Sequence, residues 1–150
     1  MGWSPSTCPP GNFRLRKADR SDLPHLVSLG EAFHAEDRWG GLLTFDPASF
    51  RRTCELLIER GAIFITERGL IGLSVGPSIY NHALTVCSEL FFWAPDGRGD
   101  ELRKAAEAWA SEHADVLVMG AHEPGPVERI SNWYRRKGYA PIGRQFARTV

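Results

Sequence analysis

The chain has 150 residues, of which 43% are hydrophobic and 24% charged, and its formal net charge is zero. A chain of this length can bury a core of its own without metals or disulfides, which indicates a single domain. The balanced charge argues against broad capture of nucleic acid or of an anionic membrane, because such binding needs a basic excess. We therefore expect partners of neither kind.

The cysteine pattern indicates a reduced, cytoplasmic setting. The number of cysteines is odd, and their spacing is not that of metal ligands: they are Cys8, Cys54 and Cys87. We therefore expect neither a disulfide framework nor a metal site. No apolar run approaches the ~20 residues that cross a bilayer. Residues 1–12 are rich in proline, serine and glycine, and we expect a disordered leader there, followed by one domain over residues 13–150.

A short strand and two helices are predicted in the first third of the chain. Residues 13–17 alternate apolar and basic side chains, which is typical of a strand. Asp19 or Ser21 can cap the helix that follows, whose apolar residues recur at helical spacing. A second helix is predicted to begin at Asp46-Pro47, because an N-cap residue followed by a first-turn proline is a strong start signal.

Strands dominate the middle of the chain. The apolar runs at 62–66 and 70–75 are joined by a polar turn and predict a β-hairpin. A third strand is predicted over residues 83–93 and ends at a turn that contains two glycines. After this turn, apolar residues repeat at i, i+3, i+4, i+7 and i+8, which indicates one face of a helix ending near His113.

The last third predicts a short buried strand over residues 116–119, then a helix from Pro126 to a C-cap at Gly138. Residues 139–149 are predicted to form a terminal strand. The complete order is β-α-α-β-β-β-α-β-α-β, without internal repeats or a linker. This order predicts an α/β domain of the α+β type, with a central mixed sheet flanked by helices.

The turn between the third long strand and its helix is suited to binding a phosphate. Free backbone N–H groups of a first helical turn point outward, and the helix dipole favours negative charge there. Gly97 and Gly99 allow a close approach of the backbone, whereas Asp100 and Glu101 would compete with a bound pyrophosphate. Because a lone G-x-G also occurs in ordinary turns, plain turn chemistry stays an alternative.

Two local patterns stand out in this order of elements. The first is a strand, proline turn, glycine loop and helix: Phe92-Trp93-Ala94-Pro95, then Gly97-Arg98-Gly99-Asp100-Glu101-Leu102. The second is Tyr134 followed by Gly138-Tyr139. Together they resemble the GNAT superfamily of acyl-CoA-dependent N-acyltransferases over residues 13–149, and the strand Glu-Leu-Phe-Phe-Trp further resembles small members from bacteriophages and prophages. The family loop usually reads Q/R-x-x-G-x-G/A, and Ala94 stands where Gln or Arg is usual.

The resemblance implies acetyl transfer from acetyl-CoA to a primary amine of a small molecule or a protein. It implies that Glu89 is the general base and that Tyr134 is the acid that protonates the leaving thiolate. The alternatives are a structural carboxylate for Glu89 and core packing for Tyr134. The cofactor-binding positions that it implies are Phe92, Trp93, Ala94, Gly97, Arg98, Gly99, Asp100 and Glu101.

Other candidates and functions stay open at this stage. Trp39, beside Gly40, stands where the family places a lid over the acceptor, and His122 and Glu123 are weaker candidate bases. Instead of an enzyme, the chain could be a degenerate GNAT domain that binds CoA or a protein, or an unrelated α/β binding protein. Neither the amine acceptor nor the oligomeric state, a homodimer included, follows from the sequence.

Overall fold

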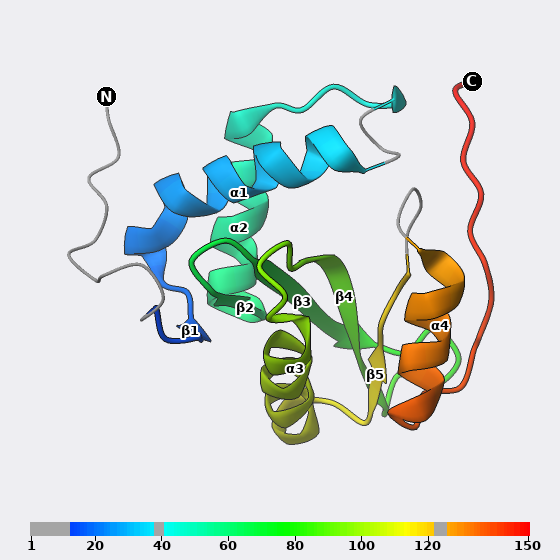
Figure 1. Cartoon of the computed structure of the whole chain (residues 1–150). Helices are drawn as coiled ribbons and strands as arrows, with labels where there is room; N and C mark the ends of the chain where they lie inside the picture. Colours follow the sequence, from blue (N-terminus) through cyan, green and yellow to red (C-terminus); the bar gives the residue numbers. More distant parts are fainter. Residues whose placement is uncertain (1–12, 38–40, 122–125) are drawn as a thin grey trace.

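A five-stranded mixed sheet forms the centre of the molecule in the computed structural model, which describes residues 13–37, 41–121 and 126–150 (Figure 1). The strands lie in chain order, and every neighbouring pair is antiparallel except β4 and β5, which are parallel. The predicted mixed sheet is therefore confirmed, whereas the predicted leader lies outside the described residues. The strands are β1 (Arg16–Lys17), β2 (Ala62–Ile65), β3 (Leu70–Pro77), β4 (Thr85–Trp93) and β5 (Val116–Val118).

The helices begin at the local signals that the sequence carries. Asp46 caps α2, and its carboxylate accepts a hydrogen bond from the Ser49 backbone N–H at 2.9 Å. Asp19 caps a short 3-10 turn that leads into α1 rather than α1 itself. No helix in the described part of the chain is long and apolar enough to span a membrane. The helices are α1 (Leu23–Glu36), α2 (Pro47–Arg60), α3 (Gly99–His113) and α4 (Val127–Arg136), with the 3-10 turn η1 (Arg20–Asp22).

Helices cover both faces of the sheet. In Figure 1, α1 and α2 lie above the sheet and α3 lies below it, while α4 stands beside β5. Strand alternation divides the core accordingly: Ile63 of β2 is buried in the cluster with Leu26 of α1, whereas Leu73 of β3 is buried with Leu102 of α3. The two-sided burial explains why β2 and β3 read as nearly continuous apolar runs.

The predicted terminal strand at 139–149 is wrong, and the first strand is shorter than predicted. Residues 140–150 are exposed and form no strand, because the chain runs along α4, where Arg144 lies 3.4 Å from Glu128, and not along the outer edge of β5. At the other end of the sheet, β1 comprises only Arg16–Lys17, and the Ala18 backbone N–H also donates to the Ile63 carbonyl of β2 at 2.7 Å. Toward residue 13 the pairing stops because the chain turns after β2, where the Thr66 backbone N–H donates to the Gly69 carbonyl at 3.0 Å.

Substituting Leu26 with alanine is expected to lower the free energy of unfolding by about 2–5 kcal/mol, because it leaves a cavity among buried side chains. Leu26 is fully buried between α1 and the sheet. Leu56→Ala on α2 is the matched control, since this leucine is 52% exposed and its loss should cost less than about 0.5 kcal/mol. Urea unfolding monitored by circular dichroism measures both changes, and equal losses would contradict the assignment of the core.

Candidate active site

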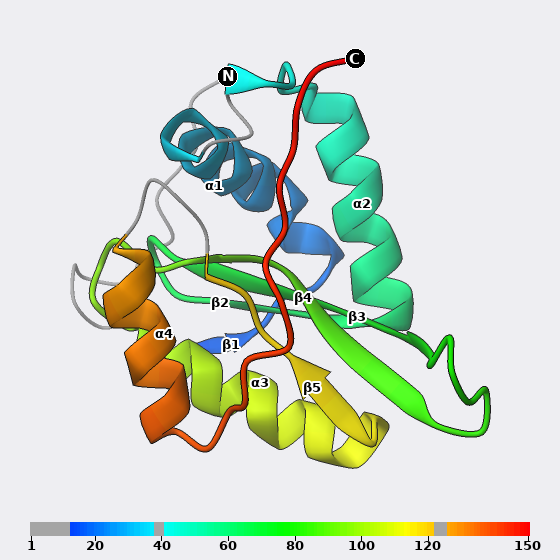
Figure 2. The same cartoon turned by 90° about the vertical axis from the view of Figure 1, so that its right-hand side faces the viewer.

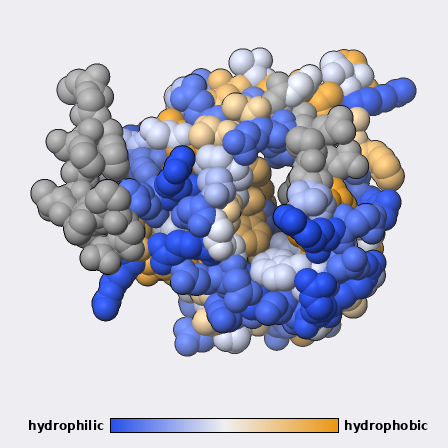
Figure 3. Space-filling view, viewed as in Figure 1, coloured by the Kyte–Doolittle hydropathy of each residue, from blue (hydrophilic) through white to orange (hydrophobic). Residues whose placement is uncertain are grey.

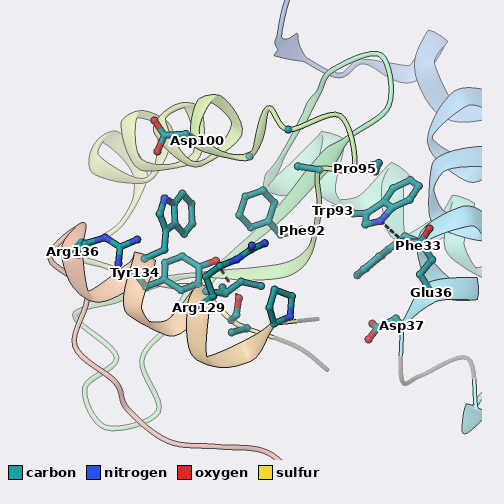
Figure 4. A pocket seen from close by; sticks show the side chains of 18 residues that line it. Phe33, Glu36, Asp37, Phe92, Trp93, Pro95, Asp100, Arg129, Tyr134 and Arg136 are labelled. Atoms are coloured by element: carbon teal, nitrogen blue, oxygen red, sulfur yellow. Dashed lines mark hydrogen bonds between the residues drawn. The ribbon is translucent and has the colours of Figure 1, made fainter. Parts of the chain in front are cut away.

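One cleft of about 920 Å³ lies where β4, α3, α4 and the end of α1 come together. The hollow is visible near the middle of the face in Figure 3, and Figure 4 shows the side chains around it. The sequence elements that build it are far apart in the chain. The residues that line it are Phe33, Glu36, Asp37, Phe92, Trp93, Ala94, Pro95, Gly97, Gly99, Asp100, Gly120, Ala121, Pro126, Arg129, Ile130, Trp133, Tyr134 and Arg136.

The cleft exists because β4 and β5 separate. Their pairing ends at Ser88 and Val118, although β4 continues to Trp93. Opposite β3, Leu73 pairs with Glu89 and Gly72 pairs with Phe91, so Leu90 is the additional residue of a β-bulge in β4. From Glu89 onward, the edge of β4 that faced β5 is therefore directed at the cleft instead of at a neighbouring strand.

The glycine loop after β4 is anchored from behind. The Asp96 carboxylate accepts hydrogen bonds from the buried Thr66 hydroxyl at 2.6 Å and from the Arg98 backbone N–H at 3.2 Å. Gly97 has φ +77°, a left-handed conformation that favours glycine. The Arg98 guanidinium is directed away from the cleft, since it donates to the Phe13 carbonyl at 2.7 Å and pairs with Glu101 at 2.6 Å.

The N-terminus of α3 presents backbone donors without a capping side chain. Arg98 at the N-cap makes no side-chain cap, and the first helical hydrogen bond runs from the Leu102 N–H to the Arg98 carbonyl. The preceding N–H groups, among them those of Gly99 and Asp100, therefore have no acceptor within the helix, and the helix dipole makes this end positive. Such an end is suited to an anion.

Asp100 does not cancel this positive end, because its carboxylate is already paired. Arg103 donates to it at 2.8 Å and Lys104 lies 3.2 Å away, with Lys137 of the segment after α4 at 3.7 Å. Hydrogen bonding to Arg103 and then to Lys104 lowers the pKa of Asp100 to about 2. Together with the Arg98–Glu101 pair, these contacts place a cation beside each acidic side chain of the first turn.

Glu89 and Tyr134 meet at a single residue, Gly120. The Gly120 backbone N–H donates to the Glu89 carboxylate at 3.1 Å, and the Gly120 carbonyl accepts from the Tyr134 hydroxyl at 3.1 Å. Burial, and next the negative charge of Glu89, raise the pKa of Tyr134 well above its usual range. The phenol therefore stays protonated throughout the neutral pH range. The three residues of this unit come from β4, from the segment after β5 and from α4.

The opposite end of the cleft is formed by α1 (Figure 4). The Trp93 indole N–H donates to the Glu36 carboxylate at 3.0 Å, and the Phe33 ring lies 6.1 Å from the Trp93 ring. Sequence reasoning missed this wall. It also missed Arg129 and Arg136 on α4, although their i, i+7 spacing, with Trp133 between them at i+4, is a detectable signal of one shared helix face.

A buried arginine fixes α4 against α3. Arg103 is 5% exposed, pairs with Asp100 and, at 2.5 Å, with Glu107, and lies 5.5 Å from the centre of the Trp133 ring. The Tyr139 hydroxyl donates to the same Glu107 carboxylate at 2.8 Å. These contacts hold the helix that carries Tyr134. Nothing in the sequence marks Arg103 as buried, because the charged helix face on which it stands reads as solvent-exposed.

The structure brings most of the predicted positions together. Arg98 and Glu101 do not line the cleft, and Glu89 contacts it through Gly120. Among the described residues, no group of three His, Cys, Asp or Glu side chains could hold a metal ion. Trp39, Gly40, His122 and Glu123 lie outside the described residues. The predicted positions that line the cleft are Phe92, Trp93, Ala94, Gly97, Gly99, Asp100 and Tyr134.

No protein-family model matches this chain, and no curated protein sequence matches it either. Solved structures do match over almost the whole chain. A predicted acetyltransferase with acetyl-CoA from Clostridium acetobutylicum has a TM-score of 0.62 at 14% identity and covers 91% of this chain and 96% of its own. A ribosomal-protein-alanine N-acetyltransferase from Brucella melitensis biovar Abortus 2308 has the same TM-score and identity, covering 92% and 99%.

A transcriptional regulator from Bacillus halodurans C-125 is similar too, with a TM-score of 0.67 at 14% identity, over 93% of this chain and all of its own. The fold is that of the GNAT acetyltransferases. Fold similarity at this level of identity leaves the chemistry of the cleft to be argued from its own residues.

Substituting Asp100 with asparagine is expected to lower the melting temperature at neutral pH, since the buried Arg103 loses a charged partner. A carboxyl with a lowered pKa stabilises the fold above its unfolded pKa, near pH 4, and this contribution is lost as the pH falls toward about 2. The difference in melting temperature between parent and variant should therefore become smaller below about pH 4. Differential scanning fluorimetry between about pH 3 and 7 measures it, with the exposed Glu112→Gln on the same helix as control. A gap independent of pH would contradict the assigned role of the carboxylate.

Proposed function

We propose that this protein transfers an acetyl group from acetyl-CoA to a primary amine of a small molecule or a protein, by direct attack in a ternary complex. The observation that carries the proposal is one continuous cleft that joins an uncapped helix N-terminus to the Glu89–Gly120–Tyr134 unit. The helix N-terminus is suited to binding a phosphate, and the Glu89–Gly120–Tyr134 unit is suited to proton transfer. Similarity to the acetyltransferase with acetyl-CoA and to the alanine N-acetyltransferase supports this pairing of cosubstrate and acceptor.

The residues of the cleft fit acetyl-CoA in charge and in backbone geometry. The N–H groups at Gly99 and Asp100 would hold the pyrophosphate, and Arg129 and Arg136 bring two further cations to the lining. The unpaired edge of β4 at Phe92 and Trp93 offers backbone groups to the amides of the pantetheine arm, as a neighbouring strand would. When bound, acetyl-CoA supplies the activated acyl group.

Transfer requires a neutral amine and a proton for the thiolate that leaves. In this proposal Glu89, which contacts the cleft through Gly120, accepts the proton that the amine loses as its nitrogen bonds to the acetyl carbon. Tyr134 carries its proton at neutral pH and can give it to the sulfur as the carbon–sulfur bond breaks. To do so, the hydroxyl has to turn from the Gly120 carbonyl, 3.1 Å away, toward the cleft. The backbone N–H groups of β4 would polarise the thioester carbonyl.

A second candidate function is a CoA-binding or protein-interaction module without turnover. Two observations favour it: the Tyr134 hydroxyl is engaged by Gly120, and a structural neighbour is a transcriptional regulator. In this alternative, Tyr134 has only a structural role in fixing Gly120, and the cleft binds its ligand without chemistry. The two candidates share the cosubstrate and differ in whether thiol is released.

The Gly99→Val variant is expected to weaken acetyl-CoA binding at least about tenfold, since a branched side chain covers the first N–H groups of α3 and a lost charge-assisted hydrogen bond costs about 1.5–3 kcal/mol. The fold has room for a side chain at position 99, because a Cβ there would lie 3.4 Å from its nearest neighbour, the Ala94 side chain. Calorimetry measures the affinity, and Gly76→Val on β3, outside the cleft, is the control. Unchanged affinity in the Gly99 variant would remove this binding site.

The Tyr134→Phe variant is expected to lose about 10²–10⁴-fold in turnover with little change in acetyl-CoA affinity, because only the donor hydroxyl is removed. A thiol-release assay with a panel of primary amines measures the rate. Tyr80→Phe is the matched control, since this tyrosine is 93% exposed between β3 and β4 and does not line the cleft. If parent and variant release thiol at the same rate, Tyr134 is structural. If the parent binds acetyl-CoA but releases no thiol with any amine, the protein is better described as a binding module.

A further inference from the structure

The cleft carries opposite charges on two of its sides. Glu36 and Asp37, the last residue of α1 and its C-cap, bring two carboxylates to the lining. Arg129 and Arg136 bring two guanidinium groups from α4. Figure 4 shows both carboxylates beside the α1 ribbon, with Arg136 at the far side of the cleft. In Figure 2, α1 lies above the sheet and α4 lies lower, next to α3. A ligand that fills the cleft therefore meets a cationic side and an anionic side.

The carboxylates of α1 stand where a helix does not favour them. The helix dipole makes a C-terminus negative, so an acidic residue in the last turn destabilises the helix. Glu36 ends α1, and Asp37 follows it directly. Residues that break a local rule of this kind are expected at functional sites, where a ligand compensates for their cost. The dipole also adds to the negative potential of these carboxylates, so this end of the cleft attracts a cation.

The Glu36 carboxylate is oriented without being neutralised by the group that holds it. The Trp93 indole N–H donates to this carboxylate at 3.0 Å. An indole is a neutral group with a single N–H donor, and an ionised carboxylate has about four acceptor positions. The Glu36 side chain is exposed, so a ligand can reach it. The Trp93 bond therefore fixes the direction of the carboxylate and leaves its charge available to a cation.

Aromatic rings stand beside this carboxylate. The Phe33 and Trp93 rings both line the cleft, and their centres lie 6.1 Å apart. Rings of this kind attract cations and pack against methylene chains. Trp93 packs with the core cluster on the α1 side of the sheet, whereas Phe92 packs with the cluster on the α3 side. The Trp93 side chain can therefore contact an acceptor on the α1 side, while the backbone edge of β4 serves the pantetheine arm.

The strand register gives the separation between this end and the proton-transfer unit. Glu89 pairs with Leu73 and Trp93 pairs with Leu70, which is three residues along β3. Three residues of a strand span about 10 Å. An extended chain advances about 1.2 Å per bond, so about eight bonds cover this distance. A linear molecule with an amine at each end and about six or seven carbon atoms between them matches this length.

We propose that the acceptor is a linear diamine: one nitrogen takes the acetyl group at the Glu89–Gly120–Tyr134 unit, and Glu36 binds the other as an ammonium group against the Trp93 ring. This inference rests on the proposed acetyl transfer and names the class of its acceptor. An alkylammonium group has a reference pKa near ~10.4, so the distant nitrogen keeps its charge at neutral pH. A neutral or anionic group at that position would leave the carboxylate without a charge partner or would be repelled by it.

The test compares three acceptors of similar length that differ in the charge of the distant end. Hexamethylenediamine, hexylamine and ε-aminocaproate carry a positive, an apolar and a negative end. We expect kcat/KM for thiol release, at saturating acetyl-CoA, to fall in this order, with about three- to tenfold between the diamine and the monoamine. Added salt should reduce this ratio, because it screens the charge of an exposed carboxylate.

The Glu36→Gln variant is expected to bring the ratio of diamine to monoamine close to one. Glutamine has the same length and can still accept the indole N–H, so only the charge is removed. Glu31→Gln is the matched control, because Glu31 is exposed on the same helix and does not line the cleft. Circular dichroism confirms that both variants fold. A parent that prefers hexylamine or ε-aminocaproate, or a diamine preference that persists in Glu36→Gln, overturns the proposal.

Binding without turnover separates this proposal from the transfer that it rests on. Saturation-transfer NMR with CoA and each of the three amines reports binding when no reaction can occur. If hexamethylenediamine binds in a Glu36-dependent way but no thiol is released from acetyl-CoA, the cation site stands and the transfer reaction is wrong. If all three amines release thiol equally well, transfer stands and the cation site is wrong. If none of them binds or reacts, the cation site is also wrong.

Discussion

The separation of β4 from β5 is the constraint on which the site depends. A parallel pair that continued to the end of β4 would fill the cleft with main-chain hydrogen bonds. Instead the pairing ends at Ser88 and Val118, and the Glu89 carboxylate takes the Gly120 N–H that a strand would otherwise satisfy. A side chain thereby replaces a ladder bond. This keeps a half-buried donor paired while leaving space between the strands.

The position of helix α4 also depends on Gly120. The Tyr134 hydroxyl of α4 donates to the Gly120 carbonyl, so both main-chain groups of Gly120 are bonded by candidate catalytic side chains. The rest of its attachment is electrostatic and aromatic, through Arg103 beneath Trp133 and Glu107 beside Tyr139. Because removing one partner from a buried charge is costly, this network ties the position of the candidate acid to the charges on α3.

The acidic residues in the first turn of α3 are paired with cations, so they do not prevent an anion from binding there. Asp100 and Glu101 favour the helix start, as acidic residues at a positive dipole end do. Both carboxylates are paired with cations, namely Arg103, Lys104 and Arg98. The backbone N–H groups at the N-terminus of α3 therefore stay available to an anion. The glycine loop is in turn held by Thr66 and Asp96, whose bond lies on the side away from the cleft.

The sequence by itself determined the elements with strong local signals. Asp46-Pro47 started α2 where expected, the apolar runs of β2 and β3 formed the hairpin, and the glycine turn led into α3. Local chemistry suffices there, because caps, turns and periodicity act within a few residues. It failed for residues 139–149, since strand composition forms a strand only where the chain lies against a strand edge, and the contact of Arg144 with Glu128 holds this segment along α4.

Only the tertiary structure decided what the site contains. Glu89 and Tyr134 are 45 positions apart in the sequence, and no local pattern could reveal that Gly120 would lie between them. The α1 wall with Glu36, and the direction of the Arg98 side chain away from the cleft, likewise follow from packing between distant elements. A sequence records which groups are present, whereas their distances arise only when burial of apolar surface brings the helices onto the sheet.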